Sequence, residues 1–396
     1  MGSEDLKIGV VGFGLRAGLW RHAHKPGQGS EVTIVCDTSE RGRADAAARI
    51  PTARVTGELQ ELIDSGIDAV LVLTPDNQHA AVAVRTLKAG IPTFCEKPLD
   101  ITIEAADSIL QAAYESGTRL YVGHNMRHMP VVVQMRELIE QGRIGEVKAV
   151  WCRHFVGHGG DYYFKDWHSE RKNVTSLLLQ KGAHDIDVIH WLAGGYARRV
   201  SAVGELAVYG KVTDRSDNST KRMGEWFSLE NWPPTEQHGL AERIDVEDIS
   251  MMNMVLDNGV LASYQQCHFT PDYWRNYTVI GTKGRIENFG DGSGERIGLW
   301  TKRTPGYAEP DETFTIQDGE GGHGGADPRL IAEFLRFASD GGPTQTSPVA
   351  ARQAVAAGVL AAESLRSDGG AREVPALPAG LVAYFESGQP ASVPSS

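Results

Sequence analysis

The sequence predicts an α/β domain with a doubly wound parallel sheet, followed by an α+β domain with a large open, mostly antiparallel sheet. Up to about residue 125, short apolar runs alternate with helical segments, which is typical of right-handed βαβ units. Beyond residue 130, longer stretches alternate polar with apolar residues, which is typical of strands that face solvent on one side. A chain of 396 residues is long enough for two such domains.

The first domain, residues 1–125, is expected to contain five buried strands separated by helices. The strands are expected at 6–14, 31–37, 67–75, 91–98 and 119–125. The helices are expected at 15–27, 41–50, 77–90 and 102–117. Gly90 and Gly117 are placed to end the last two helices, because glycine readily adopts the left-handed backbone of a C-terminal cap.

The second domain is expected at residues 126–385, with a flexible tail at 386–396. Alternating strands should fill 146–156, 197–210, 248–270 and 275–290, with hairpin turns at 257–259 and 281–284. Helices are expected at 130–142, 177–193, 327–339 and 349–366. Residues 211–245 are polar with interspersed aromatic side chains, and we interpret them as a long loop or arm.

Composition excludes several classes of partner. The formal net charge is -12 and no basic stripe is present, which argues against nucleic acid or an anionic membrane as the main partner. The four cysteines, Cys36, Cys95, Cys152 and Cys267, have no metal-ligand spacing, so we expect reduced, buried thiols and no metal site. No signal peptide or membrane-length apolar run is evident, and a cytoplasmic, non-membrane protein is expected.

A glycine-rich turn joins the first strand to the first helix. Gly12-Phe13-Gly14-Leu15-Arg16-Ala17 has the form GxGxxA. Gly12 permits the tight turn, Gly14 lets the backbone approach a pyrophosphate, and the small Ala17 allows close helix packing. The context of a buried strand before and a helix after predicts a Rossmann-type dinucleotide site, with Gly12, Phe13, Gly14, Leu15 and Arg16 in contact with the cofactor.

Asp37 ends the second strand, where a carboxylate can accept hydrogen bonds from a ribose 2′-hydroxyl. The same carboxylate repels a 2′-phosphate, so NAD is favoured over NADP. Arg41 and Arg43 lie close enough in sequence to keep NADP as an alternative.

Further polar residues follow the third strand at the edge that a dinucleotide should cross. Thr74, Pro75, Asn77 and His79 are candidates for contacts with the ribose or nicotinamide. For His79 the alternative is a histidine that bonds locally at the start of a helix.

The tripeptide Glu96-Lys97-Pro98 ends the fourth strand. A lysine at that edge can hydrogen-bond a substrate hydroxyl and steady its alkoxide during hydride loss, with Glu96 as a tether. The alternative is a partly buried ion pair with a structural role alone.

The segment 177–195 contains a second group of candidates on one predicted helix. Gln180 and His184 are four residues apart and share one helical face, and Lys181 and His184 are three apart. A satisfied core histidine is the competing interpretation of His184.

The motifs occur in the order and spacing of the Gfo/Idh/MocA oxidoreductases, which the chain resembles from about residue 6 to about 366. They are "GFGLRA", "TPDNQH", "CEKPL", "VGHNMRHMP" followed by "LIEQGRIGEV", "KGAHDIDVIHWL" and "VIGTKGRIE". The family includes glucose–fructose oxidoreductase and inositol dehydrogenase. The resemblance implies a Rossmann domain, a second domain with an open sheet, and NAD(P)-dependent oxidation of a sugar or cyclic polyol at a ring carbon.

The resemblance also implies residue roles. Lys97 and His184 would flank the carbinol, His184 taking the hydroxyl proton, while Asn125 and Arg127 would lie near nicotinamide and substrate. Many members have aspartate where this chain has Gln180. Without that carboxylate we expect His184 to be harder to protonate, and we expect an altered substrate orientation. Asp187 is expected to support the helix.

Other polar and aromatic residues suit a carbohydrate, because aromatic faces cover C–H patches while polar groups bind hydroxyls. The candidates are Tyr163, Trp167, His168, Arg171, Lys172 and His323. Trp167 could instead fill a core, His124 and His128 could be structural, and Asp327 could cap a helix.

Three functions remain open. The first is a dehydrogenase for a sugar, glycoside or cyclic polyol. The second is an NAD-dependent glycosidase or C-glycoside-processing enzyme, which oxidises C3 and then eliminates. The third is a sensor that binds the dinucleotide without catalysis, against which Lys97 and His184 argue. The resemblance implies homodimers or homotetramers built through the open sheet, and the arm at 211–245 could cover its own site or that of a neighbour.

Overall fold

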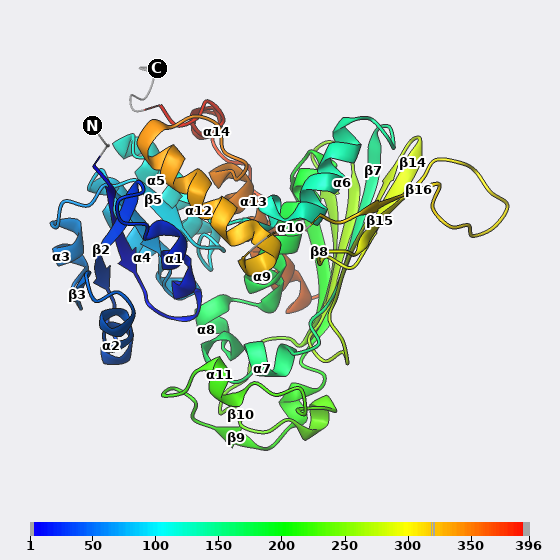
Figure 1. Cartoon of the computed structure of the whole chain (residues 1–396). Helices are drawn as coiled ribbons and strands as arrows, with labels where there is room; N and C mark the ends of the chain where they lie inside the picture. The colour runs from blue at the N-terminus through cyan, green and yellow to red at the C-terminus, as the bar shows by residue number, and fades with distance from the viewer. Residues whose placement is uncertain (1–3, 318, 320, 391–396) are drawn as a thin grey trace. The chain divides into compact units, whose positions relative to one another are not determined.

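The computed structural model describes residues 4–317, 319 and 321–390, and the chain forms two compact units (Figure 1). Unit 1 comprises Met1–Met129, Glu320–Val355 and Leu377–Ser396, and unit 2 comprises Pro130–Gly319 and Ala356–Ala376. The first boundary lies near the expected one at 125. The C-terminal segments differ from the expectation, because much of the chain after residue 320 returns to unit 1.

Unit 1 is built on a six-stranded parallel sheet with the order β3-β2-β1-β4-β5-β6. The strands are β1 (Leu6–Val11), β2 (Ser30–Cys36), β3 (Arg54–Thr56), β4 (Ala69–Val72), β5 (Thr93–Cys95) and β6 (Leu120–Val122). The order reverses between β1 and β4, which is where open α/β sheets bind ligands at the carboxyl ends of their strands.

The helices of unit 1 connect these strands and cover the sheet. They are α1 (Trp20–Ala23), α2 (Glu40–Arg49), α3 (Leu59–Ile63), α4 (His79–Lys88), α5 (Ile103–Ser116), α12 (Gly322–Asp340) and α14 (Ala379–Glu386), with the 3-10 turns η1 (Leu15–Leu19), η2 (Asp76–Gln78) and η3 (Asn125–His128). The expected helix at 15–27 is therefore a 3-10 turn followed by a single helical turn. Strand β3 and helix α3 were not expected. Strand β3 is a three-residue edge strand whose first residue is exposed, so no apolar run in the sequence indicates it.

Two apolar clusters explain why α12 belongs to unit 1. Alternate residues of β1 point to opposite faces of the sheet, so Val11 joins one cluster and Ile8 and Val10 join the other. The cluster that contains Ile8 and Val10 also contains Phe334 and Phe337 of α12. Burial of these aromatic side chains stabilises the return of the chain to unit 1.

The expected flexible tail begins inside ordered structure. Gln389 is buried, and its side-chain amide accepts from the backbone N–H of Leu120 and donates to its carbonyl, both at 2.8 Å. These bonds pair the side chain with the edge of strand β6. The remainder of the expected tail, residues 391–396, lies outside the described residues.

Unit 2 contains a nine-stranded sheet with the order β16-β15-β14-β13-β7-β12-β11-β8-β17. The strands are β7 (Val147–Phe155), β8 (Ala197–Glu205), β11 (Ile249–Leu256), β12 (Leu261–Cys267), β13 (Trp274–Gly281), β14 (Gly284–Phe289), β15 (Arg296–Trp300), β16 (Glu312–Thr315) and β17 (Arg372–Glu373). The pair β7–β12 is parallel and the other pairs are antiparallel. The expected hairpins at 257–259 and 281–284 are confirmed.

Helices lie against one face of this sheet. Helix α10 (Gly182–Ala193) packs on β7, β12 and α6 (Pro130–Glu140), and α9 (Leu177–Gln180) precedes it (Figure 1). The expected single helix at 177–193 is thus interrupted at Lys181. The backbone of Lys181 keeps right-handed helical angles (φ -88°, ψ -40°), so the side-chain directions of α9 and α10 remain related.

The arm, residues 211–245, contains short elements of its own. They are β9 (Arg215–Ser216), α11 (Met223–Trp226), η6 (Pro234–Glu236) and β10 (Leu240–Ala241), preceded by η5 (Tyr209–Lys211). Strands β9 and β10 form a two-stranded parallel sheet. The remaining helices of the chain are α7 (Gly159–Tyr163), α8 (Arg171–Val174), η4 (Trp167–Ser169) and α13 (Pro348–Leu365), which starts in unit 1 and ends in unit 2. Within the described residues, no helix combines the length and apolarity needed to cross a membrane.

Candidate active site

The glycine-rich turn after β1 has the geometry of a phosphate-binding loop. Gly12 has φ +89°, and its N–H donates to the carbonyl of Cys36 at 2.9 Å. A Cβ atom on Gly12 would lie 2.8 Å from the carbonyl of Leu73 and the nitrogen of Thr74. Only glycine allows this turn to approach the end of β4 so closely. Leu15 is exposed, and the space beside Gly14 is open.

Asp37 is fixed at the end of β2 by hydrogen bonds to both of its carboxylate oxygens. Oδ2 accepts from the N–H of Phe13 at 2.7 Å, and Oδ1 accepts from the N–H and hydroxyl of Ser39 at 2.8 and 2.7 Å. Gly42 packs against this carboxylate, and a Cβ there would collide with it. A carboxylate fixed beside the glycine-rich turn suits the ribose hydroxyls of NAD.

Arg43 does not present its guanidinium to a 2′-phosphate. Its Nη1 donates to the carbonyl oxygens of Asp37 and Thr38 at 3.0 and 2.9 Å. The backbone thus engages one of the two arginines that kept NADP open as an alternative, while Arg41 is exposed at the start of the same helix. The fixed carboxylate of Asp37 favours NAD.

Arg16 connects the glycine-rich turn with two carboxylates. Its Nε donates to Oε1 of Glu96 at 2.8 Å, and its Nη1 and Nη2 donate to the two oxygens of Asp327 at 3.1 Å each. Burial lowers the pKa of Arg16, but the two carboxylates raise it above its ordinary value. Arg16 therefore acts as an organising cation within unit 1, through a bidentate pair whose geometry lysine cannot reproduce.

Asp327 collects three donors at the start of α12. Besides Arg16 it accepts from Nδ2 of Asn125 at 3.1 Å and pairs with Nδ1 of His323 at 2.9 Å. Burial raises the pKa of Asp327, but His323 and Arg16 lower it below its ordinary range. His323 itself has φ +52°, which is uncommon for a residue with a side chain and is a conformation that concentrates at functional sites.

Lys97 follows β5, and its backbone is held from both sides. Its N–H donates to Oε2 of Glu96 at 2.8 Å. The next carbonyl, that of Pro98, accepts from Nδ1 of His79 at 2.7 Å, while Nε2 of His79 donates to the carbonyl of Thr74 at 3.0 Å. The buried ring of His79 thus ties the end of β4 to the turn that carries Lys97. Local bonding of His79 was the alternative that the sequence left open.

The residues of unit 1 fit a dinucleotide at this edge. Thr74 Oγ1 and Asn125 Oδ1 are buried and have no hydrogen-bond partner among the described residues. A buried polar atom is costly unless a partner satisfies it, and a bound cofactor can supply one. Pro75 precedes η2, and Asn77 is half-buried within it. Arg127 is buried in η3, and its Nη1 donates to the carbonyl of Gln345 at 2.9 Å.

In unit 2, Lys181 and His184 lie at the start of α10 and Gln180 ends α9. Gln180 is buried, whereas Lys181 and His184 are half-buried. The Nζ of Lys181 lies 5.8 Å from the centre of the Tyr163 ring, a cation–π distance. Gln180 and His184 thus belong to two successive helices rather than to the single helix predicted, and Asp187 is buried in the second of them.

The segment 158–173 surrounds Tyr163 with further predicted residues. His168 is buried, with Nδ1 2.6 Å from Oδ1 of Asp166, and its ring stacks on Trp167 at 3.7 Å. Arg171 and Lys172 form ion pairs with Glu247 at 3.1 Å and Glu170 at 2.8 Å. Tyr163, Trp167 and His168 are the less exposed candidates of this segment for substrate contacts.

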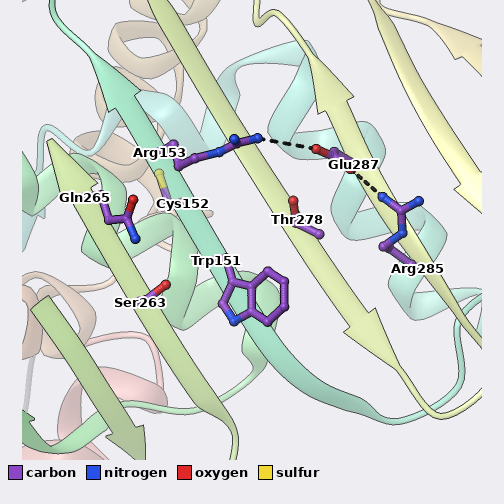
Figure 2. Close-up of a pocket in the computed structure, with 8 residues that line it drawn as sticks. All are labelled: Trp151, Cys152, Arg153, Ser263, Gln265, Thr278, Arg285 and Glu287. Carbon is purple, nitrogen blue, oxygen red and sulfur yellow. Dashed lines mark hydrogen bonds and ion pairs between the residues drawn. The ribbon is translucent and has the colours of Figure 1, made fainter. Parts of the chain in front are cut away.

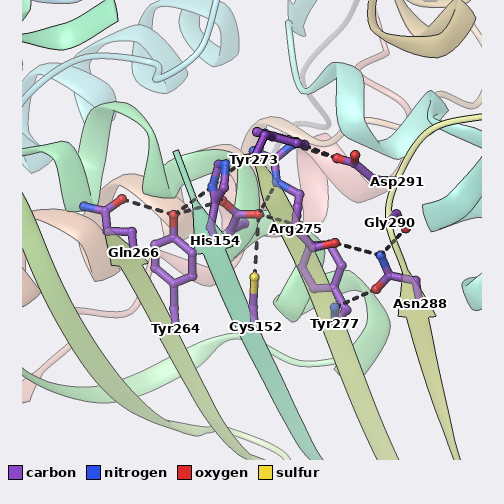
Figure 3. A network of polar contacts seen from close by, with 11 residues as sticks. Cys152, His154, Tyr264, Gln266, Tyr273, Arg275, Tyr277, Asn288, Gly290 and Asp291 are labelled. Carbon is purple, nitrogen blue, oxygen red and sulfur yellow. Dashed lines mark hydrogen bonds and ion pairs between the residues drawn. The ribbon is translucent and has the colours of Figure 1, made fainter. Parts of the chain in front are cut away.

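A buried polar network under α10 was not predicted. Asp185, the neighbour of His184, pairs with Nε of Arg275 and Nδ1 of His154 at 3.0 Å each, and it accepts from Tyr264 at 2.9 Å and from Tyr277 (Figure 3). Burial raises the pKa of Asp185, but Arg275 and His154 lower it well below its ordinary range. The network attaches α10 to three strands and thereby fixes the backbone beside His184.

Sequence reasoning missed this network because its members are spread over four elements. They come from α10, β7, β12 and β13, and the sheet register places His154 between Gln266 and Arg275. One signal was present: polar residues occupy inward positions of otherwise apolar strands. A buried position with a polar residue requires partners, and the candidates were on neighbouring strands.

Within each unit the structure gathers the predicted residues. Unit 1 brings Gly12, Arg16, Asp37, Thr74, Glu96, Lys97, Asn125 and His323 to the carboxyl edge of its parallel sheet or to residues bonded to it. Unit 2 brings Tyr163, Lys181 and His184 to the start of α10. Lys97 and His184 belong to different units.

Together these features define a class: an oxidoreductase with an NAD-binding Rossmann domain and a second domain built on an open sheet. Comparison with family models agrees. Residues 6–124 match the model described as "Oxidoreductase family, NAD-binding Rossmann fold", and residues 136–372 match "Oxidoreductase family, C-terminal alpha/beta domain". The chain belongs to the Gfo/Idh/MocA oxidoreductase family, which confirms the resemblance of the sequence motifs.

Individual relatives agree with this membership. The chain is 28% identical over 350 residues to the oxidoreductase named YteT of Bacillus subtilis (strain 168), covering 77% of this chain and 82% of the relative. It is 34% identical over 192 residues to inositol 2-dehydrogenase 2 of Saccharopolyspora erythraea, covering 48% of this chain and 54% of that relative. The chain thus matches about half the length of the inositol dehydrogenase.

Solved structures share the fold. Levoglucosan dehydrogenase in complex with NADH and levoglucosan superposes with a TM-score of 0.76 at 20% identity, covering 94% of this chain and all of that chain (100%). GenD2 from gentamicin A biosynthesis, in complex with NAD, gives 0.72 at 22% identity, covering 95% and 98%.

Proposed function

We propose that this oxidoreductase is an NAD-dependent dehydrogenase that removes a hydride from a ring hydroxyl carbon of a sugar, glycoside or cyclic polyol. In this proposal Lys97 and His184 flank the carbinol. The observation that carries it is the support of Lys97: Glu96 and His79 hold the backbone on both sides of this lysine, and Arg16 links Glu96 to the phosphate loop. Such preorganisation is typical of a catalytic lysine.

The proposed chemistry assigns each residue a task. Bound NAD supplies the acceptor for the hydride. His184 accepts the proton of the hydroxyl group, and Lys97 donates a hydrogen bond to the oxygen as its negative charge develops. Gln180 and Lys181 orient neighbouring hydroxyls, because an amide and an ammonium bind hydroxyl groups without taking their protons.

The remaining contacts are divided between cofactor and substrate. For the cofactor we propose Gly12, Phe13, Gly14, Leu15, Arg16, Asp37, Thr74, Pro75, Asn77, His79, Glu96, Lys97 and Asn125, with Arg16, His79 and Glu96 acting through the groups they position. For the substrate we propose Lys97, Arg127, Tyr163, Trp167, His168, Gln180, Lys181, His184 and His323. The named substrates of two similar proteins support the substrate class, since inositol and levoglucosan are a cyclic polyol and an anhydrosugar.

A substrate screen tests the proposal. Purified protein with NAD and a panel of monosaccharides, glycosides and cyclitols should produce reduced nicotinamide, followed by its absorbance. Lys97→Ala and His184→Ala should each lower kcat by about 10²- to 10⁴-fold, the usual contribution of a positioned acid or base. Lys88→Ala, on the exposed side of α4, is the matched control. Unchanged turnover in Lys97→Ala would contradict the assignment.

A second candidate is an NAD-dependent glycosidase that oxidises C3 and then eliminates the aglycone. The observation that favours it is the aromatic environment of Lys181, whose ammonium lies against Tyr163 in a segment rich in aromatic side chains. Glycosides with a good leaving group separate the two functions. Net reduced nicotinamide in stoichiometric amounts supports the dehydrogenase, whereas aglycone release without it supports the glycosidase.

The uncovered face of the large sheet supports a further part of the proposal, a homodimer or homotetramer. Trp151, Val203 and Leu261 are 50%, 57% and 57% exposed there. A hollow of about 560 Å³ lies on it, lined by Trp151, Cys152, Arg153, Ser263, Gln265, Thr278, Arg285 and Glu287 (Figure 2). A face that exposes large apolar side chains among arginine and other polar side chains is typical of an interface. Leu261→Asp should lower the mass measured by light scattering, and an unchanged mass would contradict the assignment.

The cysteines support a cytoplasmic setting. Cys36, Cys95 and Cys152 are buried, Cys267 is half-buried, and all four are free thiols. Free thiols are typical of reducing compartments. Cell fractionation with antibody detection tests this part of the proposal.

A further inference from the structure

The arm packs on the segment of its own unit that contains Tyr163. Asp161 anchors it: Nδ2 of Asn231 donates to Oδ1 of Asp161 at 2.8 Å, and Nε1 of Trp226 donates to its backbone carbonyl at 2.9 Å. A second anchor is Asn218, whose Nδ2 donates to the carbonyl of Lys165 at 2.9 Å. The arm therefore lies beside the segment of the same chain that carries the substrate candidates.

A continuous series of rings leads from Lys181 to the arm. Tyr163, against which Lys181 lies, is followed by Tyr162 at a ring distance of 6.2 Å. Tyr162 lies 5.7 Å from Phe227 of the arm, and Phe227 lies 5.2 Å from His158. His158 in turn lies 6.4 Å from Tyr162, so the three rings contact one another, and we call Tyr162, Phe227 and His158 the aromatic row. Tyr163 contacts both Tyr162 of this row and Lys181, which precedes His184 by three residues.

The aromatic row is accessible to a ligand. Tyr162 and Phe227 are 36% and 38% exposed, and His158 is half-buried. The rings are tilted to one another by 57° and 58°, so together they present both faces and edges. This geometry suits a further aromatic ring, which prefers tilted or edge-to-face contacts at distances of about 4.5–7 Å.

The polar groups near the row indicate what it does not bind. The carboxylate of Asp161 is buried and already bonded to Nζ of Lys165 at 2.7 Å and to Asn231, so it does not attract a cation. Aromatic faces cover the C–H patches of a second sugar ring as well, but each of its hydroxyl groups requires a partner, and in the row only the Tyr162 hydroxyl and the His158 imidazole offer polar atoms. A flat apolar group requires none.

We propose that Tyr162, Phe227 and His158 form a binding subsite for the aromatic aglycone of a glycoside. This proposal rests on the proposed function, because the sugar ring of that glycoside is the one placed at Lys181 and His184. The arm is then a specificity element for the substrate of its own chain. The sequence left open whether the arm covers the site of its own chain or that of a neighbour, and in this proposal it contributes to the site of its own chain.

Kinetics with matched substrates test the subsite in the full chain with NAD. The probes are the phenyl glycoside and the methyl glycoside of whichever sugar the screen identifies. Phe227→Ala and Tyr162→Ala should each lower kcat/KM for the phenyl glycoside by about three- to tenfold and leave the methyl glycoside unchanged. Leu229→Ala, 73% exposed on the same arm, and Tyr307→Ala, an 80% exposed ring outside it, are the controls. Equal losses for both glycosides, or no loss, would overturn the proposal.

A binding experiment separates this proposal from the proposed function. Saturation-transfer NMR with phenyl β-glucoside and phenyl β-galactoside reports contact of the phenyl protons whether or not oxidation occurs. Phenyl contact that Phe227→Ala removes supports the subsite even if no glycoside reduces NAD. Absence of phenyl contact in the unmodified protein would overturn it. So would a change of oligomeric state in Phe227→Ala, which would make the row a contact between copies, or stronger contact with a disaccharide than with the phenyl glycosides.

Discussion

Each unit contains a fully buried histidine, His79 in unit 1 and His154 in unit 2, and the surroundings drive these two imidazoles toward opposite charge states. In unit 1, His79 lies between the carbonyl oxygens of Thr74 and Pro98. Two acceptors are satisfied only when both ring nitrogens carry protons. Burial lowers the pKa of His79, but Cys95, Asp76 and the Pro98 carbonyl raise it to about 10.

In unit 2, His154 lies in the Asp185 network instead. Its Nδ1 is 3.0 Å from Oδ2 of Asp185, and the guanidinium of Arg275 is close by, 3.3 Å from the same nitrogen. Burial and the positive charge of Arg275 lower the pKa of His154 to about 3, although Asp185 raises it. His154 is therefore neutral over the physiological range.

The difference shows that the free backbone groups around a histidine decide its role. At the edge of the parallel sheet the strands end, so carbonyl groups remain available and a protonated imidazole can bridge them. Around His154 the neighbouring strands β12 and β13 satisfy the backbone of β7 on both sides, so the imidazole pairs with side chains. One histidine thus joins two strand ends, while the other belongs to a charge-balanced network whose cation is Arg275.

Removing the anion of the Asp185 network should have the largest effect. Asp185→Ala leaves Arg275 buried without its main counter-charge, and we expect a loss of about 3–5 kcal/mol in the free energy of unfolding. Urea denaturation followed by tryptophan fluorescence measures it. Asp185→Asn, which keeps the shape but not the charge, should lose a comparable amount. A loss below about 1 kcal/mol in both variants would show that the network does not stabilise unit 2.

Removing the guanidinium of Arg16 in unit 1 should lower the free energy of unfolding less than removing the Asp185 carboxylate does. It should also weaken the binding of NAD. Arg16→Gln leaves Glu96 and Asp327 without their shared partner, but the site is partly open to water, so we expect about 1–3 kcal/mol. NAD affinity, measured by calorimetry, should fall more than in Arg49→Gln, a control on the exposed side of α2. Equal NAD affinity in both variants would contradict a role of Arg16 in the cofactor site.

The sequence alone predicts the local parts of this site and not the long-range ones. The positions of Gly12 and Asp37 could be predicted because each depends on neighbouring residues in one βα turn, and their contacts with the cofactor stay a prediction. Lys97 could be placed because the carboxyl ends of parallel strands meet at one edge. The bond between Arg16 and Asp327 joins residues 311 positions apart, and no local pattern encodes it.

The same distinction between local and long-range features explains where the observed fold differs from the predicted one. Helix α12 has an amphipathic pattern that predicts a helix but not the sheet it covers. The β3 strand is too short for periodicity to reveal it. The network around Asp185 depends on which strands are neighbours, and the parallel pairing of β7 with β12 could not be expected from a sequence that predicted antiparallel hairpins.

The two histidines should also produce opposite pH dependences of stability. The folded pKa of His154 lies below the ordinary value of about 6.5, so its contribution is present above pH 6.5 and is lost as pH falls toward about 3. Asp185, whose pKa is also lowered, adds a further loss at still lower pH. Between pH 6.5 and about 3, the His154 contribution to the free energy of unfolding should change by up to about 1.4 kcal/mol per pH unit. His154→Gln should flatten that part of the curve measured by thermal denaturation; an unchanged slope would contradict a neutral His154.

His79 should give a pH dependence of the opposite sign. Its folded pKa is raised, so its contribution is complete below pH 6.5 and is lost as pH rises through about 10. His79→Gln, which cannot bridge the carbonyls of Thr74 and Pro98 with the same geometry, should flatten the alkaline part of the curve, where stability should otherwise change by up to about 1.4 kcal/mol per pH unit. Nitrogen-15 NMR gives the sharper measurement: at a pH of about 8 both ring nitrogens of His79 should carry protons, whereas His154 should carry one. A neutral His79 at that pH would mean that only one of the two strand ends is bonded, and the contrast between the units would then rest on burial alone.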